Sequence, residues 1–423
     1  MSVRYATGRI VLLVSVLACS QDDQAKSSGM QIDTVGDTIV MKALGSGPWG
    51  DEAALVEELR IGELDGAEEY VFGRISDVVA DAQGTILVLD QQARAVRRYS
   101  PDGEYLGSIG RAGSGPGELG SYASGMIFLP DGRLLVRDFR NSRINIYAVD
   151  GTPAGQLPIP AGFSTSEPLR ADTAGYVYTQ AVFDRMDDGT FTSGLLKLDL
   201  AGTVLDSIRQ PFAEFKTPRL IASRGDAQNR SVSVAGVPFT PRAHWLLDRA
   251  GQLSGAISNR YAIDTYLPDG KVRRITRDIE PVAVQAGEKA TSEERITRGM
   301  RNMDPSWRWN GPAIPDTKPP FSQIALDADG RFWVQLSQPA NRLPPDPDAR
   351  PDPAGLPPLD RWNEPIVYDV FEPDGQFLGT VHVPERTRLM YMRGDQVWAV
   401  QTDESDVQYV VRFRIVTNAT KQR

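Results

Sequence analysis

Histidine and cysteine, which carry much of the nucleophilic and metal-binding chemistry of proteins, are scarce in this sequence. The 423 residues include two histidines, His244 and His382, and one cysteine, Cys19. This set cannot build a zinc site from three histidines or from cysteines and histidines, and the sequence contains no G-x-S-x-G motif. His244, in the stretch TPRAHWLL, is the plausible catalytic imidazole, and the alternative is a histidine packed in the core. We expect His382 at the surface.

Three arginines hold similar positions in the chain, ten, nine and eight residues before a turn glycine: Arg74, Arg242 and Arg386. Guanidinium groups gathered in an otherwise acidic protein form a local site for an anion. We therefore predict that these three side chains bind an anionic group. The alternative is that each of them pairs with a carboxylate of a nearby loop.

Two aspartates, Asp90 and Asp138, each follow an apolar stretch at an equivalent place. Carboxylates at strand ends are possible calcium ligands. They are also suited to capping a tight loop by accepting hydrogen bonds from its backbone amides. No specific motif favours calcium, and the sequence predicts no cofactor.

The elements that would position these residues come from a repeating unit of four short strands. In the first unit the turn glycines Gly84 and Gly103 lie nineteen residues apart, and Tyr99 lies four residues before the second. The same spacing returns in later units. Four-stranded units of about 40–50 residues are typical of β-propellers. The six predicted blades occupy about residues 74–110, 122–160, 167–209, 240–278, 320–383 and 386–415.

The last unit ends near the chain terminus with three strands, so it lacks a fourth. Residues 54–64 alternate between apolar and polar side chains and form a spare strand. Because a closed ring removes exposed sheet edges, we predict that this strand completes the last blade. The expected fold is an all-β, six-bladed propeller of four-stranded antiparallel blades that spans residues 54–417.

The repeat resembles the NHL repeat, and the ring resembles the six-bladed TolB-like propellers. The motif positions are Gly84, Ile86, Val88, Asp90, Val96 and Tyr99, then Gly132, Leu134, Val136, Asp138, Ile144 and Tyr147. The resemblance implies a fold far better than a function, because propellers include binding modules, lyases and hydrolases. Six-bladed calcium hydrolases place Asp, Glu and Asn side chains around the axis, and the predicted inner strands of this chain show no such set.

The long insertions all fall on one face of the predicted propeller. The turns between strands one and two and between strands three and four are short, whereas the segments 181–194, 210–240, 279–319 and 338–364 are long. Because loops on a rigid scaffold carry function, this loop-rich face is the predicted binding face.

The 279–319 insert, between the fourth and fifth blades, is expected to hold a helix. Thr291 and Glu294 fit a capping box, and Ile296, Met300 and Met303 fall on one helical face. After them come two tryptophans, Trp307 and Trp309. Either they pack the helix down over the central channel, or they form an aromatic platform for a ligand.

The N-terminus resembles a bacterial lipoprotein signal. Arg4 and Arg9 precede the apolar run 10–18, which is too short to span a bilayer of about 30 Å, and Cys19 follows a small residue. We predict a signal peptide at residues 1–18, lipidation of Cys19, and a tether and lead-in at 19–53. Serine at position 20 favours the outer membrane over the inner one, by the rule for Gram-negative lipoproteins.

The net charge of −9 makes nucleic acid an unfavourable partner. The sequence therefore predicts a lipid-anchored cell-envelope propeller that binds a small anionic ligand or a protein on its loop-rich face. The alternative is a propeller enzyme, a lyase or a lactonase, that uses an axial metal or His244 at the channel mouth.

Overall fold

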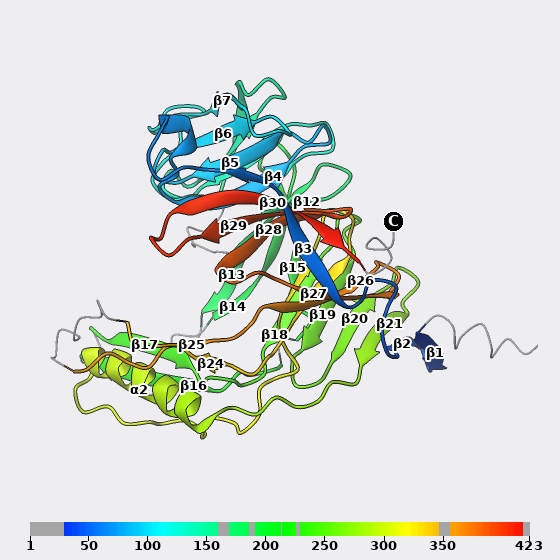
Figure 1. The fold of residues 1–423 in the computed structure, drawn as a ribbon, viewed down its shortest axis with the longest axis vertical. Helices are drawn as coiled ribbons and strands as arrows, with labels where there is room; N and C mark the ends of the chain where they lie inside the picture. Colours follow the sequence, from blue (N-terminus) through cyan, green and yellow to red (C-terminus); the bar gives the residue numbers. More distant parts are fainter. Residues whose placement is uncertain are drawn as a thin grey trace, which may run out of the picture.

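The computed structural model describes residues 29–159, 169–185, 191–212, 214–225, 229–346 and 356–417. The signal peptide, Cys19 and the tether up to residue 28 lie outside the described residues, as does the start of the third predicted blade. The described part is built mainly from β-strands, arranged in antiparallel sheets around a common centre (Figure 1).

Six units of neighbouring strands, here called sheets 1 to 6, follow one another along the chain, and β3 joins the last two into one continuous eight-stranded sheet. Sheet 1 contains β4 (Ile75–Ala80), β5 (Ile86–Asp90), β6 (Ala95–Tyr99) and β7 (Tyr105–Ile109). Sheet 2 contains β8 (Ala123–Phe128), β9 (Leu134–Asp138), β10 (Arg143–Tyr147) and β11 (Pro153–Pro158). Sheet 3 contains β12 (Arg170–Ala171), β13 (Val177–Arg185), β14 (Phe191–Leu198) and β15 (Val204–Arg209).

The second half of the chain repeats this plan. Sheet 4 contains β18 (Ala243–Leu247), β19 (Leu253–Ile257), β20 (Ala262–Tyr266) and β21 (Val272–Arg277). Sheet 5 contains β22 (Phe321–Leu326), β23 (Phe332–Leu336), β26 (Val367–Phe371) and β27 (Phe377–His382). Sheet 6 contains β28 (Thr387–Arg393), β29 (Gln396–Thr402) and β30 (Gln408–Val416), with β3 (Gly50–Ile61) beside β30.

Aspartate and glycine build the short turns between the first two strands of a sheet. In sheet 1 the Asp81 carboxylate accepts hydrogen bonds from the backbone N–H groups of Gln83 and Thr85, at 2.9 and 2.8 Å. Gly84 has a φ of +86°, a left-handed conformation that glycine adopts without strain. The same aspartate contacts recur in sheets 3, 4 and 5 at Asp172, Asp248 and Asp327.

Hydrophobic cores join each sheet to the next. Sheets 1 and 2 share one such core, and the series continues through sheets 2 and 3, 3 and 4, 4 and 5, and 5 and 6. A further core returns from sheet 6 to sheet 1, where Trp398 packs with Ile75 and Tyr99. The contacts therefore follow a circle, and the innermost strands surround its centre.

The strand β3 lies between the last two sheets. It pairs antiparallel with β30 along most of its length, and its first half also pairs parallel with β27. It begins at Gly50, four residues before the expected strand at 54–64, and ends at Ile61. A short 3-10 helix, η1 (Glu68–Tyr70), then leads into sheet 1.

Residues 30–43, expected as part of a tether and lead-in, instead form a hairpin of β1 (Met30–Val35) and β2 (Thr38–Ala43). The strand β2 pairs parallel with β21, the outer strand of sheet 4. Met30 and Ala43 are buried in the core between sheets 4 and 5. The hairpin is ordered because it covers an otherwise open sheet edge and buries these side chains.

Three of the long insertions pack together into an accessory lobe, at the lower left of Figure 1. The lobe contains β16 (Arg219–Arg224), β17 (Ser231–Gly236), α2 (Ala286–Met303), β24 (Asn341–Arg342) and β25 (Trp362–Asn363). The helix α2 begins five residues before Thr291, because Gln285 and Glu288 form the capping box in place of the expected pair. Thr291 instead accepts a hydrogen bond from the Trp362 indole N–H at 3.2 Å.

Candidate functional site

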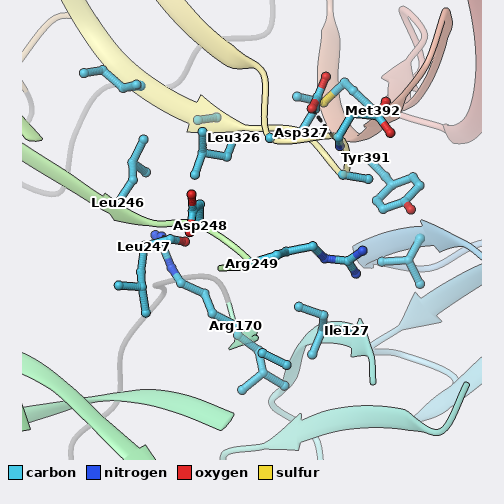
Figure 2. Close-up of a pocket in the computed structure, with 18 of the residues that line it drawn as sticks. Ile127, Arg170, Leu246, Leu247, Asp248, Arg249, Leu326, Asp327, Tyr391 and Met392 are labelled. Atoms are coloured by element: carbon cyan, nitrogen blue, oxygen red, sulfur yellow. Dashed lines mark hydrogen bonds between the residues drawn. The ribbon is translucent and has the colours of Figure 1, made fainter. Parts of the chain in front are cut away.

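A cavity of about 820 Å³ occupies the centre of the ring (Figure 2). The innermost strand of each sheet, or the residue beside it, contributes to its wall. One lining residue from each of sheets 1 to 6 is, in order, Val79, Ile127, Arg170, Leu246, Leu326 and Tyr391. The size falls within the usual range of small-molecule sites, about 300–1,000 Å³.

The cavity is bordered by the short turns. Its lining includes Thr173, the turn at 248–250 and the turn at 327–330. Among the described residues, it includes none from the long segments 181–194, 210–240, 279–319 or 338–364. The sequence predicted a binding site on the loop-rich face. The cavity in the structure is instead bordered by the short turns of the opposite face. The insertions 210–240 and 279–319 instead bury apolar side chains against one another.

The wall of the cavity combines aliphatic side chains with a few charged ones. Figure 2 shows Ile127, Leu246 and Leu326 beside the open space. Arg170 directs its guanidinium group toward Leu247, whose carbonyl oxygen accepts its hydrogen bond at 3.4 Å. Arg249 instead extends across the cavity toward the side on which Ile127 and Tyr391 lie.

The carboxylates of the wall are bound by backbone amides. Asp77 accepts hydrogen bonds from the N–H groups of Val78 and Met126, and Asp327 accepts from two amides of its own turn and from the Trp333 indole. Burial raises the pKa of both Asp77 and Asp327 to about 6, against these hydrogen bonds, which lower it. Their lone pairs are therefore largely used within the protein.

His244 lies in the wall but lacks the surroundings of a catalytic base. Its ring packs against Phe321 with 5.4 Å between the ring centroids. Burial, with a smaller contribution from the Arg242 charge, lowers the pKa of His244 to about 4. Its Nε2 is buried and has no hydrogen-bond partner among the residues that the structure describes. An imidazole base needs a group that orients its ring, so these contacts match a core histidine better. His382 is exposed at the end of β27.

The three arginines predicted to bind an anion do not line the cavity. Arg74, Arg242 and Arg386 are all exposed and stand just before β4, β18 and β28. Arg386 pairs with Asp406 at 3.2 Å. Arg74 lies near Arg388, whose pKa is lowered mainly by burial and in part by the Arg74 charge. The structure thus places the three at equivalent ends of inner strands, outside the central hollow.

The two tryptophans belong to the accessory lobe. Trp307 is 4% exposed and packs with Leu220 and Met300. Its indole N–H donates to the Ile221 carbonyl at 2.9 Å, and the Trp309 indole N–H donates to the Pro312 carbonyl at 2.8 Å. Both side chains are therefore used in packing α2 against β16 and β17.

The aspartates of the repeat motif act as loop caps. Asp90 accepts hydrogen bonds from the backbone N–H groups of Gly73, Arg74 and Gln92. Asp138 accepts from the Gly120 amide and from the Asn141 side chain. Within the described residues, no three His, Cys, Asp or Glu side chains come close enough together to hold a metal ion.

Sequence inspection missed Arg249 and Tyr391. Arg249 is the second residue of the turn Asp-Arg-Ala-Gly, and the equivalent residues of sheets 3 and 5, Thr173 and Ala328, also line the cavity. Because that turn position faces the axis in three sheets, an arginine at one of its copies was the sequence signal for a cation in the cavity.

None of the described helices is long and apolar enough to span a membrane.

Comparison with known families supports the same architecture. A family model described as a six-bladed β-propeller, DUF5128, matches residues 57–202. No curated protein sequence matches this chain. The match and the four-stranded sheets define the class of protein, a six-bladed propeller, and they do not define an activity.

The solved structures that the comparison found share little sequence with this chain. A protein of Bacteroides fragilis described as exported has 11% identity over 90% of this chain and 100% of its own, with a TM-score of 0.46. A DUF4221 member from Bacteroides vulgatus has 10% identity over 87% and 99%, with a TM-score of 0.42. Virginiamycin B lyase from Staphylococcus aureus has 11% identity over 85% and 100%, with a TM-score of 0.35.

Proposed function

We propose that this chain is a lipid-anchored β-propeller of the bacterial cell envelope that binds a small organic ligand in its central cavity. In this proposal β3 closes the ring, and the lipid on Cys19 holds the protein at the membrane, with the outer membrane favoured by Ser20. The cavity carries the binding part of the proposal. Its volume of about 820 Å³ and its mixed aliphatic and charged wall have the properties of a ligand site.

The cell-envelope part rests on the sequence around Cys19. The lone cysteine follows a short apolar run and a small residue, and described strands begin at Met30. We expect Cys19→Ala to release the protein from the membrane fraction or to block its processing. Mass spectrometry of the N-terminal peptide measures the acylation. A wild-type protein that is recovered soluble with an unmodified thiol would contradict the anchor.

Ligand binding is tested with a neutral apolar probe, phenylnaphthylamine, whose fluorescence rises in an apolar site. The variant Ile127→Trp places a bulky ring inside the cavity, whereas Val149→Trp adds the same ring to an exposed turn of the same sheet. We expect the first variant to lose most probe binding and the second to keep it. Equal binding by wild type and Ile127→Trp would place the probe elsewhere.

The loop-rich face stays a separate prediction. Arg74, Arg242 and Arg386 are exposed there, and we propose that they contact a protein partner or a larger anionic group, for which Arg386 would have to give up its ion pair with Asp406. A lyase or lactonase activity gains no specific support, because the carboxylates of the cavity wall are held by turn amides and His244 lacks an orienting partner.

A further inference from the structure

We infer that the cavity binds an amphipathic organic anion whose acid group is held between the guanidinium group of Arg249 and the hydroxyl group of Tyr391. This inference rests on the proposed function, since it names the chemistry of the ligand for the same cavity. It assigns the acid-binding end of the site to the short-turn side of the channel.

The backbone that carries Arg249 is fixed, whereas its side chain is extended into the hollow. The Asp248 carboxylate accepts hydrogen bonds from the N–H groups of Ala250 and Gln252 at 2.9 and 2.7 Å, and the Arg249 carbonyl accepts one from Thr173 at 2.8 Å. Figure 2 shows the side chain crossing the open space. A cation presented from a rigid turn loses little freedom when it binds a ligand.

Arg249 differs from its neighbours in what it contacts. Arg170, Arg388 and Arg393 each donate to a backbone carbonyl, of Leu247, Ile75 and Asp81 respectively. The Arg249 guanidinium has no hydrogen bond or ion pair to another described residue. Five donors on a planar group are therefore available to an acid, and a carboxylate or sulfonate is the group that they fit best.

Tyr391 supplies a second donor on the side toward which Arg249 points. It lies in β28, with its ring 5.5 Å from the Trp398 ring. Burial, with a smaller contribution from the Asp329 charge, raises the pKa of the Tyr391 hydroxyl, and the charges of Arg393 and Arg249 oppose the rise. The hydroxyl therefore keeps its proton at neutral pH and can donate it to an acid oxygen.

The acidic side chains of the cavity wall do not occupy the position proposed for the acid group of the ligand. Asp248 and Asp327 accept amides of their own turns, and the Asp329 carboxylate accepts the Gly394 N–H at 2.5 Å. Asp77 accepts the Met126 N–H at 2.6 Å. Each of these carboxylates is thus directed at backbone amides, whereas Arg249 projects into the space that a ligand would fill.

The remaining wall favours an apolar body attached to the acid group. Ile127, Leu246, Leu326 and Met392 line the hollow around Arg249. An inorganic anion would leave these side chains in contact with water, and an apolar body would cover them and gain the free energy of that burial.

The test compares two probes that share an aryl body and differ in charge. Anilinonaphthalene sulfonate carries an acid group, and phenylnaphthylamine does not. Both are titrated into the full-length chain carrying Cys19→Ala, alone and combined with Arg249→Gln, Arg249→Lys or Tyr391→Phe. Arg260→Gln is the matched control, because Arg260 is exposed in the β19–β20 turn of the same sheet. Binding of the neutral probe reports that each variant is folded.

We expect Arg249→Gln to weaken sulfonate binding roughly tenfold or more and to leave the neutral probe unchanged. Arg249→Lys should recover part of the loss, and Tyr391→Phe should weaken sulfonate binding by a smaller factor. Arg260→Gln should change neither probe. Inorganic phosphate should not displace the sulfonate, because it lacks the apolar body.

Two results would overturn the inference. The first is that Arg249→Gln binds the sulfonate as tightly as wild type while Ile127→Trp binds neither probe. The ligand would then bind in the cavity without contacting Arg249. Displacement of the sulfonate by an equal concentration of phosphate would remove the requirement for an apolar body. Failure of the proposed function has a different signature, since both probes would then be insensitive to Ile127→Trp.

Discussion

The two ends of the central channel differ in how much chain surrounds them and in how much space they leave. At the loop-rich end, the insertions 210–240 and 279–319 bury Leu220, Met300 and Trp307 in a core of their own. At the short-turn end, tight turns closed by aspartate and glycine leave the axis open as a cavity of about 820 Å³. The more elaborate end therefore holds a packed core of its own, whereas the cavity is bordered by the short turns.

The difference shows that loop length alone does not locate a site. Long insertions carry apolar side chains that must be buried, and here they bury one another together with the ion pairs of Lys318 with Glu288 and Glu364, at 2.8 and 2.7 Å. The short turns at 248–250 and 327–330 border an open cavity instead, and Arg249 in the first of these turns extends into it.

Deletion of β3, residues 50–61, has the largest expected effect because it disturbs both ends at once. Leu55 and Ile61 belong to the cores on either side of sheet 6, and the strand pairs along β30. Without it, β30 and β27 each present an open edge. We expect aggregation or loss of cooperative unfolding, measured by light scattering and circular dichroism. A monomeric deletion variant with an unchanged melting curve would contradict closure by β3.

Trp307→Ala separates the two ends by damaging only the accessory lobe. Removing a buried tryptophan costs about 3–5 kcal/mol. The loss should appear as faster hydrogen exchange in α2, while probe binding in the cavity stays unchanged. If the variant loses cavity binding and keeps its protection in α2, the tryptophan serves a ligand and not the lobe.

His244→Phe tests the wall of the cavity through the dependence of stability on pH. The pKa of His244 is lowered to about 4 from its ordinary 6.5, so the unfolded chain binds a proton that the folded chain does not. Stability is therefore lost as pH falls from 6.5 toward 4, by about 2 kcal/mol at pH 5. Asp77 and Asp327 have raised pKa values in the folded protein, so their contribution to stability increases as pH falls. This contribution is the same in wild type and in His244→Phe.

Urea unfolding of wild type and His244→Phe at pH 7.5 and pH 5 measures this difference. The contribution of the two aspartates cancels in the comparison. We expect the variant to be relatively more stable at the lower pH by the amount given above. Parallel pH profiles would show that His244 is protonated as readily in the folded protein as in the unfolded chain.

Arg242→Gln has the smallest expected effect on cavity binding. Arg242 and Arg249 stand before and after the same strand, β18, at opposite ends of the channel. Fluorescence titration with the sulfonate probe should therefore give the same affinity for Arg242→Gln as for wild type. If Arg242→Gln lost as much affinity for the sulfonate as Arg249→Gln, the anion would be bound at the loop-rich face.

Much of the fold could be predicted from the sequence because its marks are local. The nineteen-residue spacing between Gly84 and Gly103 reflects two turns in which both glycines have a positive φ, +86° and +89°. The motif aspartates Asp90 and Asp138 could be interpreted as caps for the same reason, since their hydrogen-bond partners include amides of neighbouring loops.

The features that were missed depend on distant parts of the chain. The hairpin at 30–43 pairs with β21, which lies more than two hundred residues later in the chain. The sequence of the hairpin itself does not indicate this pairing. The start of α2 was placed late because glutamine at position 285 is an unusual cap. The direction of Arg249 follows from where its turn stands relative to the axis, which a linear pattern does not contain.

Protection of an introduced thiol tests most directly whether the ligand lies in the short-turn end of the channel. Cys19 is the one cysteine of the chain, so Cys19→Ala combined with Ile127→Cys or with Ser306→Cys gives a single thiol in the cavity or on the exposed surface of the lobe. The rate of maleimide labelling is measured with and without phenylnaphthylamine. We predict that the probe slows labelling at position 127 and not at position 306. Equal rates at position 127 with and without the probe, or protection at position 306 alone, would contradict the central claim.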